Sequence, residues 1–273
     1  MHCSCRSDPH GACFLCYRLF YAAKIAVFLH PHYFFCFFLH SENSIFIFLP
    51  YLCARKAIHN TSSMKTLEKI FAAKLLKVKA IKLQPTNPFT WASGWKSPFY
   101  CDNRKTLSYP ELRSFVKIEI ARIILERFPE VDAIAGVATG AIPQGALVAD
   151  ELALPFVYVR SKPKDHGLEN LIEGELKPGM KVVVVEDLIS TGGSSLKAVE
   201  AIRTNGCEVI GMVAAYTYGF DVAAKAFKEA KVQLVTLTNY EAVVEEALRI
   251  GYINEPDVQL LNEWRRDPAH WNV

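Results

Sequence analysis

Two adjacent acids, Glu186 and Asp187, lie between a run of four valines and a turn rich in glycine and hydroxyl groups. The valine run is typical of a strand that is covered on both faces. Glycines let the backbone approach an anion closely, and the N–H groups and dipole at a helix start hold phosphate. The segment therefore predicts a phosphate site beside two carboxylates. The turn is Ser190-Thr191-Gly192-Gly193-Ser194.

The paired acids narrow the choice of ligand. Carboxylates beside the turn would repel a bare polyphosphate, but they accept hydrogen bonds from the neighbouring hydroxyls of a sugar. A ribose phosphate satisfies both halves of such a site. An ordinary helix cap at a solvated strand end is the alternative, and it explains the serines and glycines but not the paired acids. The spacing matches neither a dinucleotide fingerprint nor a P-loop.

A second candidate segment, residues 160–167, is basic and begins a long polar stretch that reaches Gly179. Long loops inside compact α/β domains are usually functional. Basic side chains on such a loop can neutralise a departing pyrophosphate, and a closing loop excludes water from the reaction. A solvated basic turn is the alternative interpretation of this charge run.

Alternating strand and helix patterns surround both segments. The repeats predict an α/β fold with a doubly wound, mostly parallel sheet in one catalytic domain. In such sheets ligands bind beyond the carboxyl ends of the strands, which is where the acids and the turn fall. We expect strands at residues 132–138, 155–160, 181–185, 208–216 and 233–237, and helices at residues 142–151, 193–204, 222–230 and 240–250.

A smaller N-terminal part precedes the alternating region. A helical stripe of apolar residues covers residues 65–83 and is stopped by two prolines. Residues 89–103 combine aromatic residues with Ser-Gly and Ser-Pro turns, which predicts a strand pair forming a small N-terminal hood. Residues 108–111 read Ser-Tyr-Pro-Glu, which predicts a capping box and a helix to about residue 128.

The first 63 residues differ in composition from the rest of the chain. Their apolar runs show neither helical nor strand periodicity, and charged residues and proline leave no uninterrupted span of about 20 residues for a bilayer. We interpret them as upstream translation before a start at Met64, so that residues 64–273 form the functional domain. A membrane anchor and a zinc site are the alternatives. The zinc site would use Cys3, Cys5, Cys13 and Cys16.

Charge and cysteine use separate the same two regions. Residues 1–63 carry a formal charge of +3, whereas basic and acidic residues are equal in number in residues 64–273. A neutral domain without a basic stripe argues against a nucleic-acid partner. Six of the eight cysteines precede residue 54. The remaining two, Cys101 and Cys207, form no disulfide framework, which is typical of a reducing cytoplasm.

Residues 182–194 resemble the phosphoribosyl pyrophosphate signature of type I phosphoribosyltransferases. That signature has four apolar residues, two acids, and a Ser/Thr-Ser/Thr-Gly-Gly-Ser turn two residues later, and every position fits. The loop with Arg160 and Lys164-Asp165-His166-Gly167 resembles the catalytic loop of orotate phosphoribosyltransferases. Residues 89–98 are similar to the orotate-side segment of that family, and residues 136–141 to its pyrophosphate-binding turn.

The resemblance implies a reaction and a role for each matching residue. Ribose 5-phosphate would pass from phosphoribosyl pyrophosphate to orotate, with Mg²⁺ held by the substrate and no direct protein ligand. Lys164 would be catalytic, Ser190 would also contact orotate, and loop 160–167 would be shared between the subunits of a homodimer. The residues implied to bind phosphoribosyl pyrophosphate are Arg160, Lys164, His166, Glu186, Asp187, Leu188, Ile189, Ser190, Thr191, Gly192, Gly193 and Ser194.

The chain departs from the family pattern where cations are expected. Ser161 stands where some members have a second lysine, Ala92 where some have lysine, and residues 216–220 contain no arginine. Lys96 or Arg104 is a candidate to replace these cations near the orotate carboxylate. Two other functions stay open: a purine phosphoribosyltransferase, and a non-catalytic nucleotide-sensing regulator with the same fold. A membrane-tethered enzyme is a third alternative.

Overall fold

The computed structural model describes residues 6–7, 13–14, 24–30, 33–39, 61–90, 96–162 and 171–271. It divides into two compact units, Met1–Asn60 and Thr61–Val273. The first unit contains two antiparallel strand pairs, in which β1 (Arg6–Ser7) pairs with β2 (Cys13–Phe14) and β3 (Lys24–His30) pairs with β4 (Tyr33–Leu39). The sequence of this region lacks strand periodicity, but its aromatic and β-branched residues favour strands even when they do not alternate with polar ones.

The second unit is built on a six-stranded sheet with the order β11-β10-β9-β12-β13-β14. Only the pairing of β10 with β11 is antiparallel, and the other four pairings are parallel. The doubly wound, mostly parallel fold that the sequence predicts is thereby confirmed. The strands are β9 (Ala133–Val137), β10 (Phe156–Val159), β11 (Ile172–Glu173), β12 (Lys181–Ile189), β13 (Glu208–Thr217) and β14 (Leu234–Asn239).

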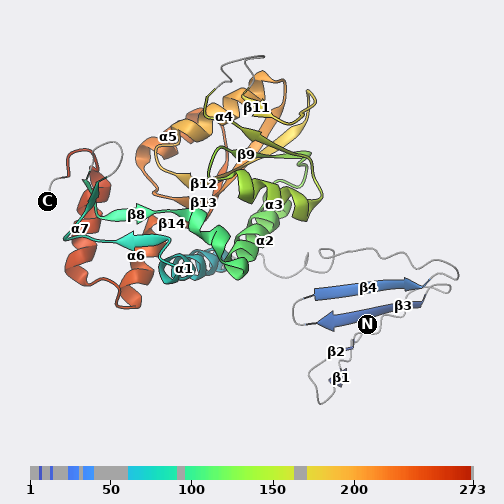
Figure 1. Ribbon diagram of the computed structural model, residues 1–273, viewed down its shortest axis with the longest axis horizontal. Helices are drawn as coiled ribbons and strands as arrows, with labels where there is room; N and C mark the ends of the chain where they lie inside the picture. The colour runs from blue at the N-terminus through green and yellow to red at the C-terminus, as the bar shows by residue number, and fades with distance from the viewer. Residues whose placement is uncertain are drawn as a thin grey trace. The chain divides into compact units, whose positions relative to one another are not determined.

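Helices cover both faces of this sheet, as Figure 1 shows. Along β12, Val183 and Val185 pack into the core shared with α1, α2 and α3, whereas Val182 and Val184 pack into the core shared with α4 and α5. The valine run is therefore buried on both sides, as its composition predicts. The helices are α1 (Thr61–Lys77), α2 (Pro110–Arg127), α3 (Ile142–Leu152), α4 (Gly193–Thr204), α5 (Asp221–Glu229), α6 (Tyr240–Arg249) and α7 (Glu255–Arg266).

The predicted hood consists of two short antiparallel pairs. Strand β6 (Phe89–Thr90) pairs with β7 (Lys96–Ser97), and β8 (Phe99–Cys101) pairs with β5 (Ile81–Leu83). A 3₁₀ helix, η2 (Asn103–Ser108), then connects β8 to α2. The chain therefore passes from the hood through η2 to α2, and η2 lies against β12 of the sheet.

Two local expectations in this part were wrong. The helix predicted over residues 65–83 ends at Lys77, because Lys79 adopts a positive φ of 53° and frees Ile81 and Leu83 to pair with β8. The capping box at residues 108–111 does not form. Ser108 belongs to η2, so the N-cap of α2 is Tyr109, which makes no side-chain capping bond.

Helix α7 had no counterpart among the predicted elements. Its start carries clear signals, because Asn254 and Asp257 form a reciprocal capping box around a proline in the first turn. Trp264 on its inner face is fully buried, and its indole Nε1 donates to the carbonyl oxygen of Lys96 at 3.2 Å. The C-terminal helix therefore holds the hood in place.

Candidate active site

The acidic pair lies at the carboxyl ends of β9 and β12, the two central strands of the sheet. Strand β12 was expected to end at Val185, but it continues through both acids to Ile189, which pairs with Thr217 of β13. The pairing of β12 with β9 stops at Val185 opposite Gly136. The acids therefore project beyond β9, while β13 keeps their backbone extended.

Glu186 is the deeper of the two acids, with 4% of its surface exposed. Its carboxylate accepts a hydrogen bond from the Ser195 hydroxyl at 2.7 Å and another from the Asp187 amide at 3.0 Å. Burial, and then the nearby charge of Asp187, raise the pKa of Glu186 well above its ordinary value. A buried acid with a raised pKa is common at functional sites.

Asp187 is half-buried and is held by neighbours from two other segments. The Asp187 carboxylate packs directly against Gly140, where a Cβ atom would force this side chain to move. On the other side, the Asn103 side-chain amide donates to the carbonyl oxygen of Asp187 at 2.6 Å. The turn after β9 and the segment after β8 therefore both position Asp187.

The start of α4 lies next in the chain. Gly192 is its N-cap with a φ of 82°, and a Cβ there would also lie 2.8 Å from the Phe227 ring. A helix start leaves backbone N–H groups without intrahelical acceptors, and an anion can bind them. Thr191 and Ser194 are exposed beside these groups. The predicted phosphate turn therefore has the backbone geometry that such a site needs.

These parts surround one cavity of about 220 Å³. It is lined by residues 101–104 after the hood, residues 137–140 after β9, and Glu186, Asp187, Leu188 and Ser194. Three segments far apart in the sequence thus meet at the carboxyl edge of the sheet. Carboxylates, a helix start and a close-packed glycine turn share one hollow of small-molecule size.

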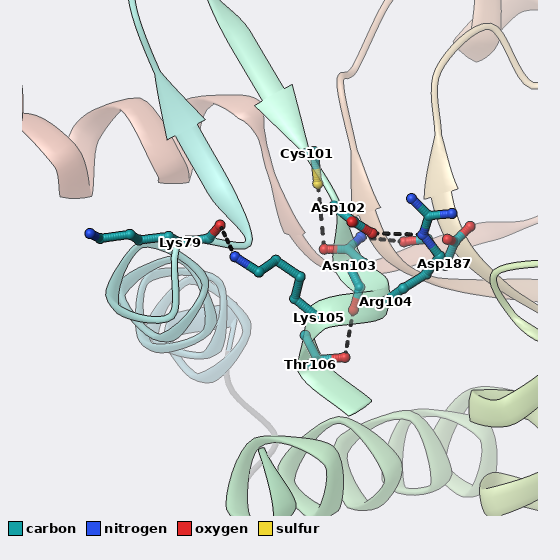
Figure 2. A network of polar contacts seen from close by, with 8 residues as sticks. All are labelled: Lys79, Cys101, Asp102, Asn103, Arg104, Lys105, Thr106 and Asp187. Atoms are coloured by element: carbon teal, nitrogen blue, oxygen red, sulfur yellow. Dashed lines mark hydrogen bonds and ion pairs between the residues drawn. The ribbon is translucent and has the colours of Figure 1, made fainter. Parts of the chain in front are cut away.

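The wall formed by residues 101–104 was largely missed from the sequence. Figure 2 shows that Asn103 points to Asp187, while the Arg104 guanidinium Nε donates to the Asp102 carboxylate at 2.7 Å. Only Arg104 had been considered, as a possible replacement cation. The polar run directly after an aromatic strand was the available signal, because strand ends next to a sheet edge often carry site residues.

Other predicted residues lie elsewhere. Arg160 directly follows β10, its guanidinium lies 3.5 Å from the Glu173 carboxylate, and it does not line the cavity. Lys164 and His166 lie outside the described residues, as does Ala92. Lys96 is exposed and donates to the Thr90 hydroxyl at 3.0 Å.

Residues 216–220 contain no arginine, but an arginine from another element binds their backbone. Arg265 of α7 donates from Nε to the carbonyl oxygen of Tyr218 at 3.1 Å and from Nη2 to that of Gly219 at 3.0 Å. Its third nitrogen forms an ion pair of 2.6 Å with Glu241. This cation is therefore engaged in holding the loop after β13.

Comparison with known proteins identifies the class that this fold and site define. Residues 113–249 match the family model described as a phosphoribosyl transferase domain. Over 210 residues, the chain is 83% identical to the orotate phosphoribosyltransferase of Phocaeicola vulgatus and 84% identical to that of Bacteroides fragilis, in each case spanning 77% of this chain and 99% of the relative. The chain belongs to the orotate phosphoribosyltransferase family.

Solved structures agree with this assignment. The orotate phosphoribosyltransferase of Aeropyrum pernix superposes with a TM-score of 0.59 at 29% identity, covering 67% of this chain and 99% of its own. UMP synthase of Leishmania donovani superposes with a TM-score of 0.62 at 26% identity, covering 74% of this chain and 43% of its own. The type I phosphoribosyltransferase fold is therefore confirmed.

Proposed function

We propose that the chain transfers ribose 5-phosphate from phosphoribosyl pyrophosphate to orotate, giving orotidine 5′-phosphate and pyrophosphate in pyrimidine biosynthesis. The observation that carries the proposal is the cavity in which the acids of β12 meet the start of α4. Sugar hydroxyls and a phosphate need these two kinds of partner at adjacent positions. Relatives more than 80% identical over nearly their whole length carry the same activity in their names.

We expect the ribose phosphate to bind with its phosphate at the start of α4 and its ribose beside the two acids. The 5′-phosphate binds the turn of residues 190–194, where backbone N–H groups and hydroxyls converge at the start of α4. The ribose hydroxyls face Glu186 and Asp187, of which Asp187 is the more accessible. Ser190, the first residue of this turn, also contacts orotate in this proposal.

Bond exchange at the anomeric carbon requires positioning and charge rather than a protein nucleophile. The bond to pyrophosphate breaks through an oxocarbenium-like state while orotate N1 bonds to the opposite face. The two acids stabilise positive charge that develops on the ribose. Lys164, Arg160 and His166 neutralise the departing pyrophosphate, with Lys164 as the catalytic residue.

Magnesium belongs to this proposal as a partner of the substrate. The carboxylates of Asp102 and Asp187 line the cavity, and oxygen ligands of this type suit the ion. Within the part of the chain that the structure describes, no group of three or more His, Cys, Asp or Glu side chains forms a metal site. We expect Mg²⁺ to bind pyrophosphate and ribose oxygens, where it supplies charge neutralisation of the leaving group.

The proposal extends to the assembly and the location of the protein. Two copies share their sites through loop 160–167. The residues before α1, which begins at Thr61, take no part in the catalytic fold. The free thiols of Cys101 and Cys207 suit a reducing cytoplasm. None of the helices in the described residues has the length and apolar character needed to span a membrane.

Assays with single bases test the proposed function. The full chain is incubated with phosphoribosyl pyrophosphate and Mg²⁺, and with orotate, hypoxanthine, xanthine or adenine in turn. Orotate should be consumed with equimolar release of pyrophosphate, and the purines should be consumed far more slowly. Faster turnover of a purine would assign the chain to purine salvage chemistry, and salt-dependent nucleic-acid binding without turnover would indicate a regulator.

A further inference from the structure

The acceptor base poses an electrostatic problem in this cavity. Orotate carries a carboxylate, yet Asp102, Glu186 and Asp187 all line the space into which it must fit. An anion brought next to acids in a partly enclosed site needs a cation with good hydrogen-bond geometry. Among the described residues that line the cavity, Arg104 is the one cation.

Arg104 is oriented for ligand binding by a neighbouring acid. Its Nε donates to the Asp102 carboxylate at 2.7 Å, and its side chain keeps 64% of its surface exposed. An arginine has five N–H donors in a planar fork, so this single bond fixes the plane while the terminal nitrogens stay available. Figure 2 shows the guanidinium on the side of Asp187, where the ribose is expected.

The segment that carries Arg104 is anchored to the sugar side of the site. Asn103, the preceding residue, donates to the carbonyl oxygen of Asp187 at 2.6 Å. Lys105, the following residue, extends the opposite way and donates to the carbonyl oxygen of Lys79 at 3.1 Å (Figure 2). One of two adjacent cations thus faces the cavity and the other faces the N-terminal part of the domain.

Other described cations near the site have different partners. Lys96 is bonded to the Thr90 hydroxyl, Arg160 lies against Glu173, and Arg265 binds two backbone carbonyls and Glu241. None of these three lines the cavity. Arg104 therefore combines position, orientation and available donors.

We propose that Arg104 binds the carboxylate of orotate through its terminal nitrogens and that Asp102 positions it. The inference rests on the proposed function, because it assigns the acceptor side of the same site. Arginine and carboxylate form a planar two-bond pair that uracil, the same ring without the carboxylate, cannot make. Arg104 would then select orotate over uracil.

The test compares Arg104→Gln with Lys105→Gln, its adjacent control, in steady-state kinetics of the full chain. Loss of a charge-assisted pair should raise the KM for orotate about ten- to hundredfold in Arg104→Gln. The KM for phosphoribosyl pyrophosphate and the slow rate with uracil should stay within about twofold, since neither depends on a carboxylate contact. Lys105→Gln should behave as the parent protein.

Equilibrium binding provides a readout that does not depend on turnover. The parent protein should bind orotidine 5′-phosphate more tightly than uridine 5′-phosphate, and Arg104→Gln should bind the two equally. Arg104→Lys should recover part of the preference, which also covers the case in which the glutamine variant fails to fold. An unchanged KM for orotate, or a rise confined to phosphoribosyl pyrophosphate, would overturn the inference. Absence of orotate turnover in the parent protein would instead refute the proposed function.

Discussion

At the residue scale, Glu186 links the chemistry of the site to the stability of the fold. Its carboxyl is buried and accepts hydrogen bonds from the Ser195 hydroxyl and the Asp187 amide. Burial raises its pKa, so between the ordinary and the raised pKa the folded protein keeps a proton that the unfolded chain has lost. The free energy of unfolding attributable to Glu186 therefore falls as pH rises through that window.

Glu186→Gln should remove this pH dependence, because glutamine has no proton to lose. We expect the Tm of the variant relative to the parent to increase as pH rises above 4.5, the ordinary pKa of a glutamate. Thermal unfolding of both proteins over a series of pH values measures the trend. Glu200→Gln, which alters an exposed acid on the same helix as Ser195, is the control and should show none. A parallel trend in the control would contradict the assignment to Glu186.

At the element scale, α7 contacts two segments, the hood and the loop after β13, at residues outside the cavity. Trp264 bonds to the hood at Lys96, and Arg265 bonds to the loop after β13 at Tyr218 and Gly219. The aromatic rings of Phe99, Tyr218 and Trp264 also contact one another between these segments. The C-terminal helix therefore sets the distance between the hood and the edge of the sheet.

Arg265→Gln should loosen this arrangement. Loss of hydrogen bonds from a charged donor should lower the free energy of unfolding by about 1 to 3 kcal/mol. We also expect a higher KM for orotate, because the β13 loop lies on the side of the hood. Arg266→Gln alters the adjacent, exposed arginine and should change stability by no more than about 0.5 kcal/mol. Denaturant unfolding measures both, and equal stability losses would argue against a specific role for Arg265.

At the scale of the whole molecule, the shared-loop proposal means that each site takes its loop from one subunit and its cavity from the other. Variants of the loop and of the cavity can therefore be combined in one dimer. Lys164→Ala removes the catalytic cation of the loop, and Asp187→Asn removes an acid of the cavity. Each variant alone should have very low turnover. In a mixed dimer, one site combines both defects and the other is intact.

Mixing the two inactive variants after reversible dissociation should therefore restore activity. Random exchange in a symmetric dimer predicts about a quarter of the parent turnover, because half of the dimers regain one of two sites. Each variant refolded alone is the control. If the mixture shows no more activity than the two variants separately, the sites are formed within single subunits.

Much of the domain was predictable because its signals are local. Periodicity and burial run along single strands, so the helix at Gly193–Thr204 matched its prediction and the valine run was correctly assigned to both cores. Errors arose where the local sequence favours a helix but pairing with a distant strand decides the structure. Ile81 and Leu83 continue a helical stripe in sequence, yet β8 draws them into a strand.

The sequence by itself determined the family, the α/β fold and the acid-and-glycine segment, because each depends on residues that are close in the chain. Only the tertiary structure decided which other residues share the cavity. Asn103 and Gly140 reach Asp187, and Arg265 reaches Tyr218, across separations that periodicity and motif spacing do not encode. The physical reason is that sheet register and helix packing bring these side chains together, and both depend on contacts throughout the domain.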